Sequence, residues 1–161
     1  MQKVSVFIDL ENTIIKTWNN HDLINILKIR NQLDSLQNFD RTIGIFSFAI
    51  YNETDKHIFN RDIKKKIEEA LNVKIKVFPS IEDILFIIMK GTGCIWNSDS
   101  DEDVYEFFNL KGKSGAFEDF CISQGKTEEH FILIDDMVPD KIIEFKRTGL
   151  KIEFINVDTL D

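Results

Sequence analysis

Carboxylate, hydroxyl and ammonium side chains stand beside several short apolar runs of this sequence, at spacings that could form one reactive site. They belong to Asp9, Glu11, Thr13, Ser47, Lys111, Lys113, Asp135, Asp136 and Asp140. A lone aspartate after an apolar run is more often a turn residue or a helix cap than a catalyst. The joint occurrence of these residues is much less expected by chance, and it favours a shared site.

Side chains of these types can together transfer a phosphoryl group. One carboxylate can attack phosphorus and form an aspartyl-phosphate, which divides one difficult step into two easier ones. A second carboxyl group two residues later can protonate the leaving oxygen and then activate water. Magnesium needs only one or two carboxylates and a phosphate oxygen as ligands, because it keeps several waters. A lysine and a hydroxyl can bind the remaining phosphoryl oxygens and compensate their charge.

Five apolar runs predict the β-strands that must position these residues. They span residues 4–8, 42–46, 74–78, 130–134 and 151–156. Apolar residues at helical spacing predict the helices between them. These helices span 22–36 with Asp22 as cap, 60–71, 84–89 after a Ser80–Asp83 capping box, 114–123, and a last one from Pro139 to Gly149. Because strands alternate with helices, we expect an α/β fold: a three-layer α/β/α Rossmann-like parallel sheet that binds ligands at the carboxyl ends of its strands.

Composition limits the class of protein further. The 161 residues fit a single domain spanning 1–161, and an apolar content of 43% is enough for a core. A net charge of -8 argues against a broad nucleic-acid-binding face, which needs basic residues. No run approaches the roughly 20 apolar residues of a membrane span, and the first residues do not resemble a signal peptide. Cys94 and Cys121 are far apart in the sequence, so we expect a cytoplasmic protein without a disulfide scaffold.

Four segments, in this order, resemble the motifs of the haloacid dehalogenase-like superfamily of phosphatases. The first motif of that family, Asp-x-Asp-x-Thr after a strand, is similar to Asp9–Thr13, and the second, a Ser or Thr ending the next strand, is similar to Ile45–Ser47. The third, a lysine before a helix, resembles Lys111–Phe117, and the fourth resembles Ile132–Asp136. Met137–Phe145 and Gly149–Ile152 resemble the family's final helix and strand. The resemblance implies a magnesium-dependent phosphatase that hydrolyses a phosphomonoester through an aspartyl-phosphate.

The resemblance also implies catalytic roles. Asp9 is the expected nucleophile and a magnesium ligand, and the Leu10 carbonyl is a further ligand. Lys111 or Lys113 is the charge-neutralising lysine, since both spacings occur in the family. Glu11 takes the acid/base position, where the family's phosphatases usually have Asp. Its extra methylene moves the carboxyl group outward by about 1.5 Å, and a shift of about 1 Å can cost on the order of a hundredfold in rate. Slow turnover, a different substrate geometry and lost turnover therefore all stay open.

The remaining candidate residues are implied to bind substrate or metal. Thr13 and Ser47 are expected to bind the substrate phosphate. Asp136 is expected to bind magnesium, with Asp135 or Asp140 assisting.

The segments between the motifs are short for the inserted cap domains of this family. Residues 14–40 and 48–110 hold few extra elements, although 91–110 could form a small lid. The resemblance therefore implies a capless or minimally capped site. Such a site suits a bulky phosphorylated substrate or one reached at a chain end, including the phosphorylated end of a nucleic acid.

Two alternatives stay open at this point. Phe7–Asn12 is also similar to the opening of NYN/PIN-type ribonucleases, and Ser98–Asp101 is similar to their later acidic motif. Those enzymes collect carboxylates around a metal ion without a covalent nucleophile, but this interpretation leaves Ser47 and Asp135–Asp136 without a role. The other alternative, motivated by Glu11, is a non-catalytic binding protein that retained the haloacid dehalogenase-like fold.

Overall fold

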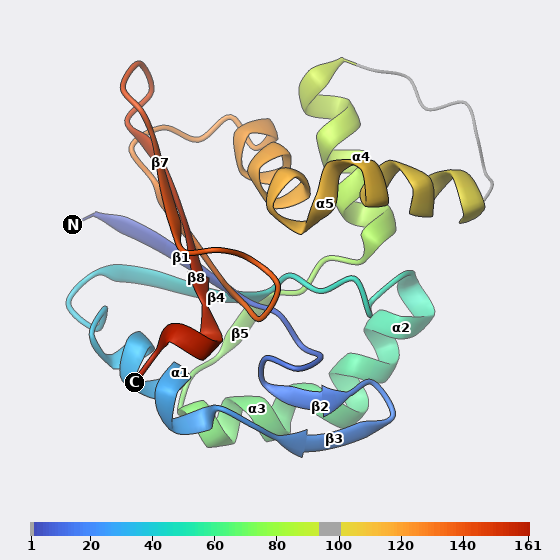
Figure 1. The fold of residues 1–161 in the computed structure, drawn as a ribbon, viewed down its shortest axis with the longest axis vertical. Coiled ribbons are helices and arrows are strands. Elements are labelled where there is room, and N and C mark those ends of the chain that lie inside the picture. The colour runs from blue at the N-terminus through green and yellow to red at the C-terminus, as the bar shows by residue number, and fades with distance from the viewer. Residues whose placement is uncertain (1, 94–100) are drawn as a thin grey trace.

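The computed structural model describes residues 2–93 and 101–161, and within them a six-stranded sheet forms the centre of the fold (Figure 1). Its strands, in spatial order, are β5 (Ile75–Val77), β4 (Asp40–Ile45), β1 (Lys3–Ile8), β6 (His130–Asp135), β8 (Leu150–Asn156) and β7 (Lys141–Phe145). Neighbours are parallel from β5 to β8, and β7 runs antiparallel to β8. The predicted α/β class with a largely parallel sheet is confirmed.

The register of β1 brings several strand ends to one edge of the sheet. Ile8, the last residue of β1, pairs with Ile45 of β4 on one side and with Ile134 of β6 on the other. Beyond β6, Asp135 pairs with Asn156, the last residue of β8. Residues that follow these strands therefore lie near one another, however far apart they are in the sequence.

Helices cover both faces of the sheet (Figure 1). One face packs against α1 (Ile26–Asp34), a π-helical turn over 59–63 and α3 (Lys64–Leu71). The short α2 (Glu53–Ile58), which has no buried residue, leads into that turn. The other face packs against α4 (Ile81–Thr92) and α5 (Asp101–Ser123). Val4, Val6 and Ile8 of β1 belong to the first core and Phe7 to the second, which explains why a strand buried on both faces reads as a continuous apolar run. This arrangement is compatible with the predicted three layers.

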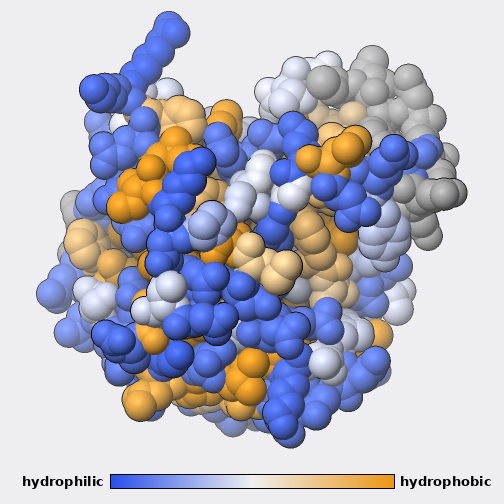
Figure 2. Space-filling view, in the orientation of Figure 1, coloured by the Kyte–Doolittle hydropathy of each residue, from blue (hydrophilic) through white to orange (hydrophobic). Residues whose placement is uncertain are grey.

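The outer surface is largely hydrophilic on the face seen in Figure 2, where apolar residues form small separate patches, one of them over α5. None of the helices in the described part of the chain is both long and apolar enough to cross a membrane.

Two local signals determine how α4 and α5 are built. Ser80 Oγ accepts a hydrogen bond from the Asp83 N–H, and the Asp83 carboxylate accepts one from the Ser80 N–H, so the predicted capping box is confirmed. α5 begins earlier than the predicted residue 114 and is interrupted at Gly112, where φ is 70° and ψ is 170°. Glycine adopts these angles readily, whereas other residues are strained there. Gly112 thus separates the two halves of α5 immediately before Lys113.

The predicted helix over 22–36 begins later than expected, because a hairpin precedes it. β2 (Ile15–Thr17) pairs antiparallel with β3 (Asn20–Leu23), and α1 begins only at Ile26. The prediction that Asp22 caps this helix is therefore wrong. Asn25 lies at the helix boundary in a left-handed conformation, and its side-chain amide donates a hydrogen bond to the Thr13 carbonyl. This contact with the turn after β1 places the start of α1, and the local cap signal at Asp22 could not reveal it.

The predicted helix between Pro139 and Gly149, which the family resemblance also implied, is wrong. Residues 141–145 form β7, and Gly149, with φ of 72°, lies in the turn that joins β7 to β8. Ile143 and Phe145 pack against the core beneath α4 and α5, whereas Ile142 is exposed. A short apolar run can form either element, and here pairing with the free edge of β8 decides for a strand.

Candidate functional site

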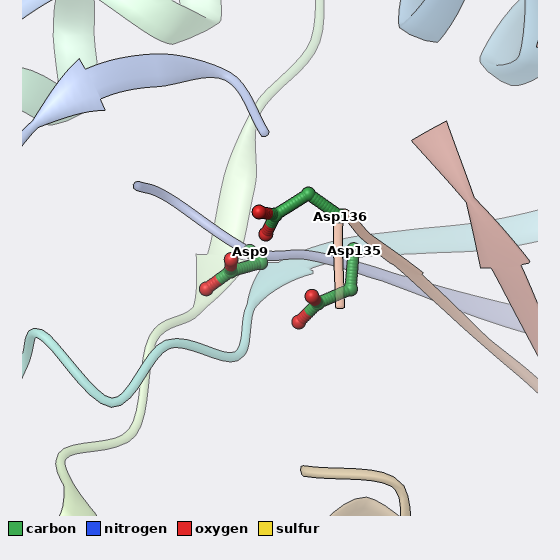
Figure 3. Close-up of side chains that lie close together, drawn as sticks. All are labelled: Asp9, Asp135 and Asp136. Carbon is green, nitrogen blue, oxygen red and sulfur yellow. The ribbon is translucent and has the colours of Figure 1, made fainter. Parts of the chain in front are cut away.

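Three aspartates meet at the sheet edge where β1 and β6 end (Figure 3). Asp9 follows β1, Asp135 is the last residue of β6, and Asp136 comes next; carboxylate oxygens of the three lie within 4.8 Å of one another. Parallel pairing causes this meeting, and the Asp9 N–H continues it by donating to the Ile134 carbonyl at 3.0 Å. The structure therefore brings together three of the five acids expected to share the site.

The three carboxylates are crowded and largely shielded from water. Asp9 is 7% exposed and Asp135 is 1% exposed. Burial raises the pKa of Asp9 to about 6; the Lys113 ammonium opposes this rise and the Asp135 carboxylate adds to it. Burial, and then the charge of Asp135, also raises the pKa of Asp136. Such a cluster needs positive charge nearby if all its members are to be ionised at neutral pH.

Lys113 supplies part of that charge. Its Nζ lies 3.0 Å from Asp9 Oδ1 and 3.3 Å from Asp135 Oδ2. The same ammonium group lies 4.5 Å from the centre of the Phe48 ring, close enough for a cation–π interaction. Lys113 therefore connects the two buried carboxylates and an aromatic side chain from the loop after β4.

Lys111 lies elsewhere. Its Nζ forms an ion pair with Asp119 at 2.7 Å, within α5. The non-helical backbone at Gly112 separates the two lysines, so they need not continue along one helical face. Of the two lysines between which the sequence did not choose, Lys113 is the one that contacts Asp9 and Asp135, whereas Lys111 pairs with Asp119.

Thr13 lies beneath the carboxylates. Its hydroxyl is 3.2 Å from Asp9 Oδ2 and 3.3 Å from Asp136 Oδ1, and it accepts a hydrogen bond from the Asp136 N–H at 3.1 Å. One hydroxyl hydrogen can serve only one of the two carboxylates at a time. The fully buried Thr13 side chain therefore positions Asp9 and Asp136, and its expected contact with the substrate phosphate stays a prediction.

Ser47 follows β4 at the same edge of the sheet. Its buried hydroxyl accepts a hydrogen bond from the Ala49 N–H at 3.2 Å. This contact shapes the loop that leaves β4, and the hydroxyl hydrogen is still available for donation. Ser47 thus lies at the same sheet edge as Asp9, and its expected role in binding phosphate stays a prediction.

Three other candidates are engaged outside the carboxylate cluster. The Leu10 carbonyl, expected to bind metal, accepts hydrogen bonds from backbone N–H groups of residues 13–15. Glu11 Oε2 accepts one from the Trp18 N–H at 2.9 Å and so ties the first motif to the β2–β3 hairpin. Asp140 accepts one from the Asn156 N–H at 2.7 Å. Asp140 is therefore not part of the candidate metal site.

The three carboxylates of the cluster could hold a metal ion. Asp135 Oδ2 is buried and has no hydrogen-bond partner within the described residues, although Lys113 is close by. A buried acceptor without a partner is costly, and a cation would satisfy it. Asp9 and Asp136 add further carboxylate oxygens, the ligand type that magnesium prefers.

Asn156 is a further residue that positions the site, and the sequence interpretation missed it. Its side-chain amide donates hydrogen bonds to the carbonyls of Asp136, at 3.3 Å, and Val138, at 2.9 Å. These bonds hold the loop that follows β6. Asn156 ends β8, so the rule that selected residues at the carboxyl ends of parallel strands could have found it.

The acidic motif of the ribonuclease alternative, Ser98–Asp101, has residues 98–100 outside the described part of the chain. Among the residues that the structure describes, the carboxylates that meet Asp9 belong to Asp135 and Asp136, to which that alternative assigns no role.

No protein-family model matches this chain. Comparisons with curated proteins and with solved structures give no significant match either. What the protein does must therefore be inferred from the chemistry of the carboxylates, of Lys113 and of the residues that hold them.

Proposed function

We propose that this protein is a magnesium-dependent phosphatase with a haloacid dehalogenase-like fold, which hydrolyses a phosphomonoester through an aspartyl-phosphate on Asp9. The observation that carries the proposal is the position of Lys113 Nζ, between Asp9 Oδ1 and Asp135 Oδ2 at 3.0 and 3.3 Å. A carboxylate can approach an anionic phosphate only where positive charge offsets the repulsion between them. The Lys113 ammonium supplies positive charge directly beside the Asp9 carboxylate.

Asp9, Asp135 and Asp136 are the residues that would hold the magnesium ion. When bound, a divalent cation supplies Lewis-acid charge that stabilises the phosphoryl oxygens as charge develops on them. Lys113 would bind a phosphoryl oxygen that the cation does not contact. The Thr13 hydroxyl holds the Asp9 carboxylate, and the Asn156 side chain holds the loop after β6.

The reaction takes two displacement steps. In the first, an Asp9 oxygen forms a bond to phosphorus while the bond from phosphorus to the ester oxygen breaks, and the leaving alkoxide takes a proton from Glu11. In the second, water attacks phosphorus and gives a proton back to Glu11 while the bond to Asp9 breaks. Inorganic phosphate leaves, and both side chains return to their starting state.

Glu11 must be free to move for these proton transfers. In the structure its carboxylate accepts a hydrogen bond from the Trp18 N–H at 2.9 Å, so proton transfer requires the other carboxylate oxygen or a rotation of the side chain. This contact favours slow turnover. It also supports a second candidate function, a non-catalytic protein that binds a phosphorylated partner through the same metal and lysine.

The decisive experiment measures phosphate release from an aryl phosphate with magnesium and with a chelator. We expect magnesium-dependent release that Asp9→Asn abolishes, while Asp140→Asn, an exposed carboxylate outside the cluster, retains it. Mass spectrometry of acid-quenched wild type should show one added PO3 group. Activity that survives Asp9→Asn contradicts the mechanism. An inactive wild type that magnesium and phosphate still stabilise against unfolding supports the binding protein.

A further inference from the structure

Two aromatic pairs form a row that leads away from Lys113. The loop after β4 supplies Phe48 and Tyr51, and α5 supplies Phe108 and Tyr105. The ring centres of Phe48 and Phe108 lie 5.2 Å apart, as do those of Tyr51 and Tyr105. Each segment contributes two residues three positions apart, and the first residue of one segment pairs with the last residue of the other. The four rings are here called the aromatic row.

The aromatic row runs from the core to the surface, and its inner end is at the candidate active site. Phe108 is buried, whereas Tyr105 is 51% exposed. At the inner end, the Phe48 ring centre lies 4.5 Å from Lys113 Nζ, the same atom that lies 3.0 Å from Asp9 Oδ1. A phosphate held by Lys113 would therefore have an aromatic side chain beside it, with further rings outward.

Half-exposed aromatic rings offer flat apolar faces and edges at little conformational cost. Phe48 and Tyr51 are half-buried, so part of each side chain is accessible. Aromatic groups interact with one another by offset stacking or edge-to-face contact, which adds to ordinary apolar burial. An aliphatic group of similar size gains only the burial.

We propose that the aromatic row selects phosphomonoesters whose alcohol carries a planar aromatic ring close to the ester oxygen. The inference rests on the proposed phosphatase function, because it takes Lys113 as the phosphate-binding group. The short distance between Phe48 and Lys113 requires the ring to lie near that oxygen, which excludes rings on long flexible chains. Both an aryl alcohol and a nucleoside present such chemistry.

The test compares substrates that differ only in aromaticity. Benzyl and cyclohexylmethyl phosphate have primary alkoxide leaving groups of similar reactivity, so a difference in kcat/KM reports on the ring. We expect wild type to favour benzyl phosphate by about two- to tenfold, in line with the strength of aromatic pairs. Phe48→Leu should abolish the preference, while Phe86→Leu, an exposed aromatic on α4, should retain it. Equal kcat/KM values in wild type overturn the proposal.

A second variant tests the proposal if Phe48→Leu does not fold. Tyr105→Leu changes a half-exposed side chain at the outer end of the aromatic row, and 2-naphthylmethyl phosphate extends a second ring in that direction. We expect wild type to favour it over benzyl phosphate and the variant to lose this gain. An unchanged ratio in a folded Tyr105→Leu protein contradicts the proposal.

Binding measurements separate this inference from the phosphatase proposal. With magnesium present, calorimetry should show tighter binding of benzylphosphonate than of cyclohexylmethylphosphonate, whether or not the protein turns over substrate. Thymidine 5′-phosphate compared with 2-deoxyribose 5-phosphate tests a nucleobase in the same way. A preference in either pair supports the aromatic row and identifies the source of the ring. Equal affinities in both pairs, or no binding of any of these compounds, overturn it.

Discussion

The ammonium group of Lys113 lies 3.0 Å from Asp9 Oδ1, although 104 residues separate them in the sequence. Asp9 leaves the carboxyl end of β1, and Lys113 resumes α5 directly after the break at Gly112. The other Asp9 oxygen lies 3.2 Å from the Thr13 hydroxyl. Both carboxylate oxygens of the expected nucleophile thus have a partner, which limits the directions in which it can face.

Replacing the two lysines separately should have very different effects. Lys113→Met removes the cation beside Asp9, and we expect phosphate release to fall by at least about a hundredfold, as when a transition-state donor is lost. Lys111→Met breaks only the ion pair with Asp119 and should change the rate little. Steady-state kinetics on an aryl phosphate measures both. Equal losses in the two variants would show that Lys113 has no special role.

Removing the Asp135 carboxylate should reveal the metal site without any measurement of activity. Asp135→Asn deletes a buried carboxylate whose Oδ2 has no hydrogen-bond partner among the described residues, but it also removes the ion pair with Lys113. We therefore expect little net change in the unfolding free energy of the metal-free protein. The variant should lose most of its stabilisation by magnesium. Asp140→Asn is the matched control and should keep that stabilisation. Urea unfolding of both variants with and without magnesium measures this stabilisation. If magnesium stabilises the two variants equally, Asp135 is not a ligand of the metal.

Two substitutions of Glu11 separate proton transfer from structure. Glu11→Gln can still accept a hydrogen bond from the Trp18 N–H but cannot transfer a proton, so we expect normal stability and a rate lower by about a hundredfold or more. Glu11→Asp should release the hairpin, cost about 1 kcal/mol in unfolding free energy, and raise the rate above wild type. Thermal unfolding and phosphate release measure the two effects. Full activity in Glu11→Gln excludes an acid/base role.

The backbone at Gly112 should matter more than that at the nearby helical glycine. Gly112→Ala forces a side chain into φ 70° and ψ 170°, and we expect a loss of about 1–3 kcal/mol in stability, together with reduced activity because Lys113 shifts. Gly115→Ala places a Cβ 3.8 Å from the Lys111 Cβ, an ordinary contact, and should stabilise α5 by up to about 1 kcal/mol. Denaturant unfolding compares them. Equal stability changes in the two variants would mean that a side chain at position 112 does not strain the backbone.

The hydrogen bond between His130 and Glu153 should contribute stability that is lost at acid pH. His130 Nε2 lies 3.0 Å from Glu153 Oε1 across β6 and β8, and this hydrogen bond holds the pKa of Glu153 below its usual value despite burial. A lowered folded-state pKa means that the stabilisation is present above the unfolded pKa and is lost as pH falls through the folded one. Glu153→Gln should therefore lose less stability than wild type between about pH 5 and about pH 3. Glu144→Gln changes an exposed side chain of β7 and should behave as wild type. If the stability of Glu153→Gln falls with pH as steeply as that of wild type, the pairing is contradicted.

Much of the fold follows from local sequence. Runs such as Val4–Ile8 and His130–Ile134 are apolar without alternation because both faces of their strands are buried, and that pattern is visible without coordinates. Once these strands are taken as parallel neighbours, Asp9, Asp135 and Asp136 have to share an edge. The capping box at Ser80 is equally local, since all its atoms lie within one turn.

Other features depend on contacts between segments that the sequence does not pair. Whether 141–145 forms a strand depends on the free edge of β8, and the choice of Lys113 over Lys111 depends on where α5 packs after Gly112. Glu11 faces Trp18 because a hairpin returns beside it. The sequence by itself thus determined the five parallel strands and the acids that follow β1 and β6, because burial and strand ends are local patterns. Only the tertiary structure decided which side chains meet, because a hydrogen bond or ion pair requires both partners within about 3 Å.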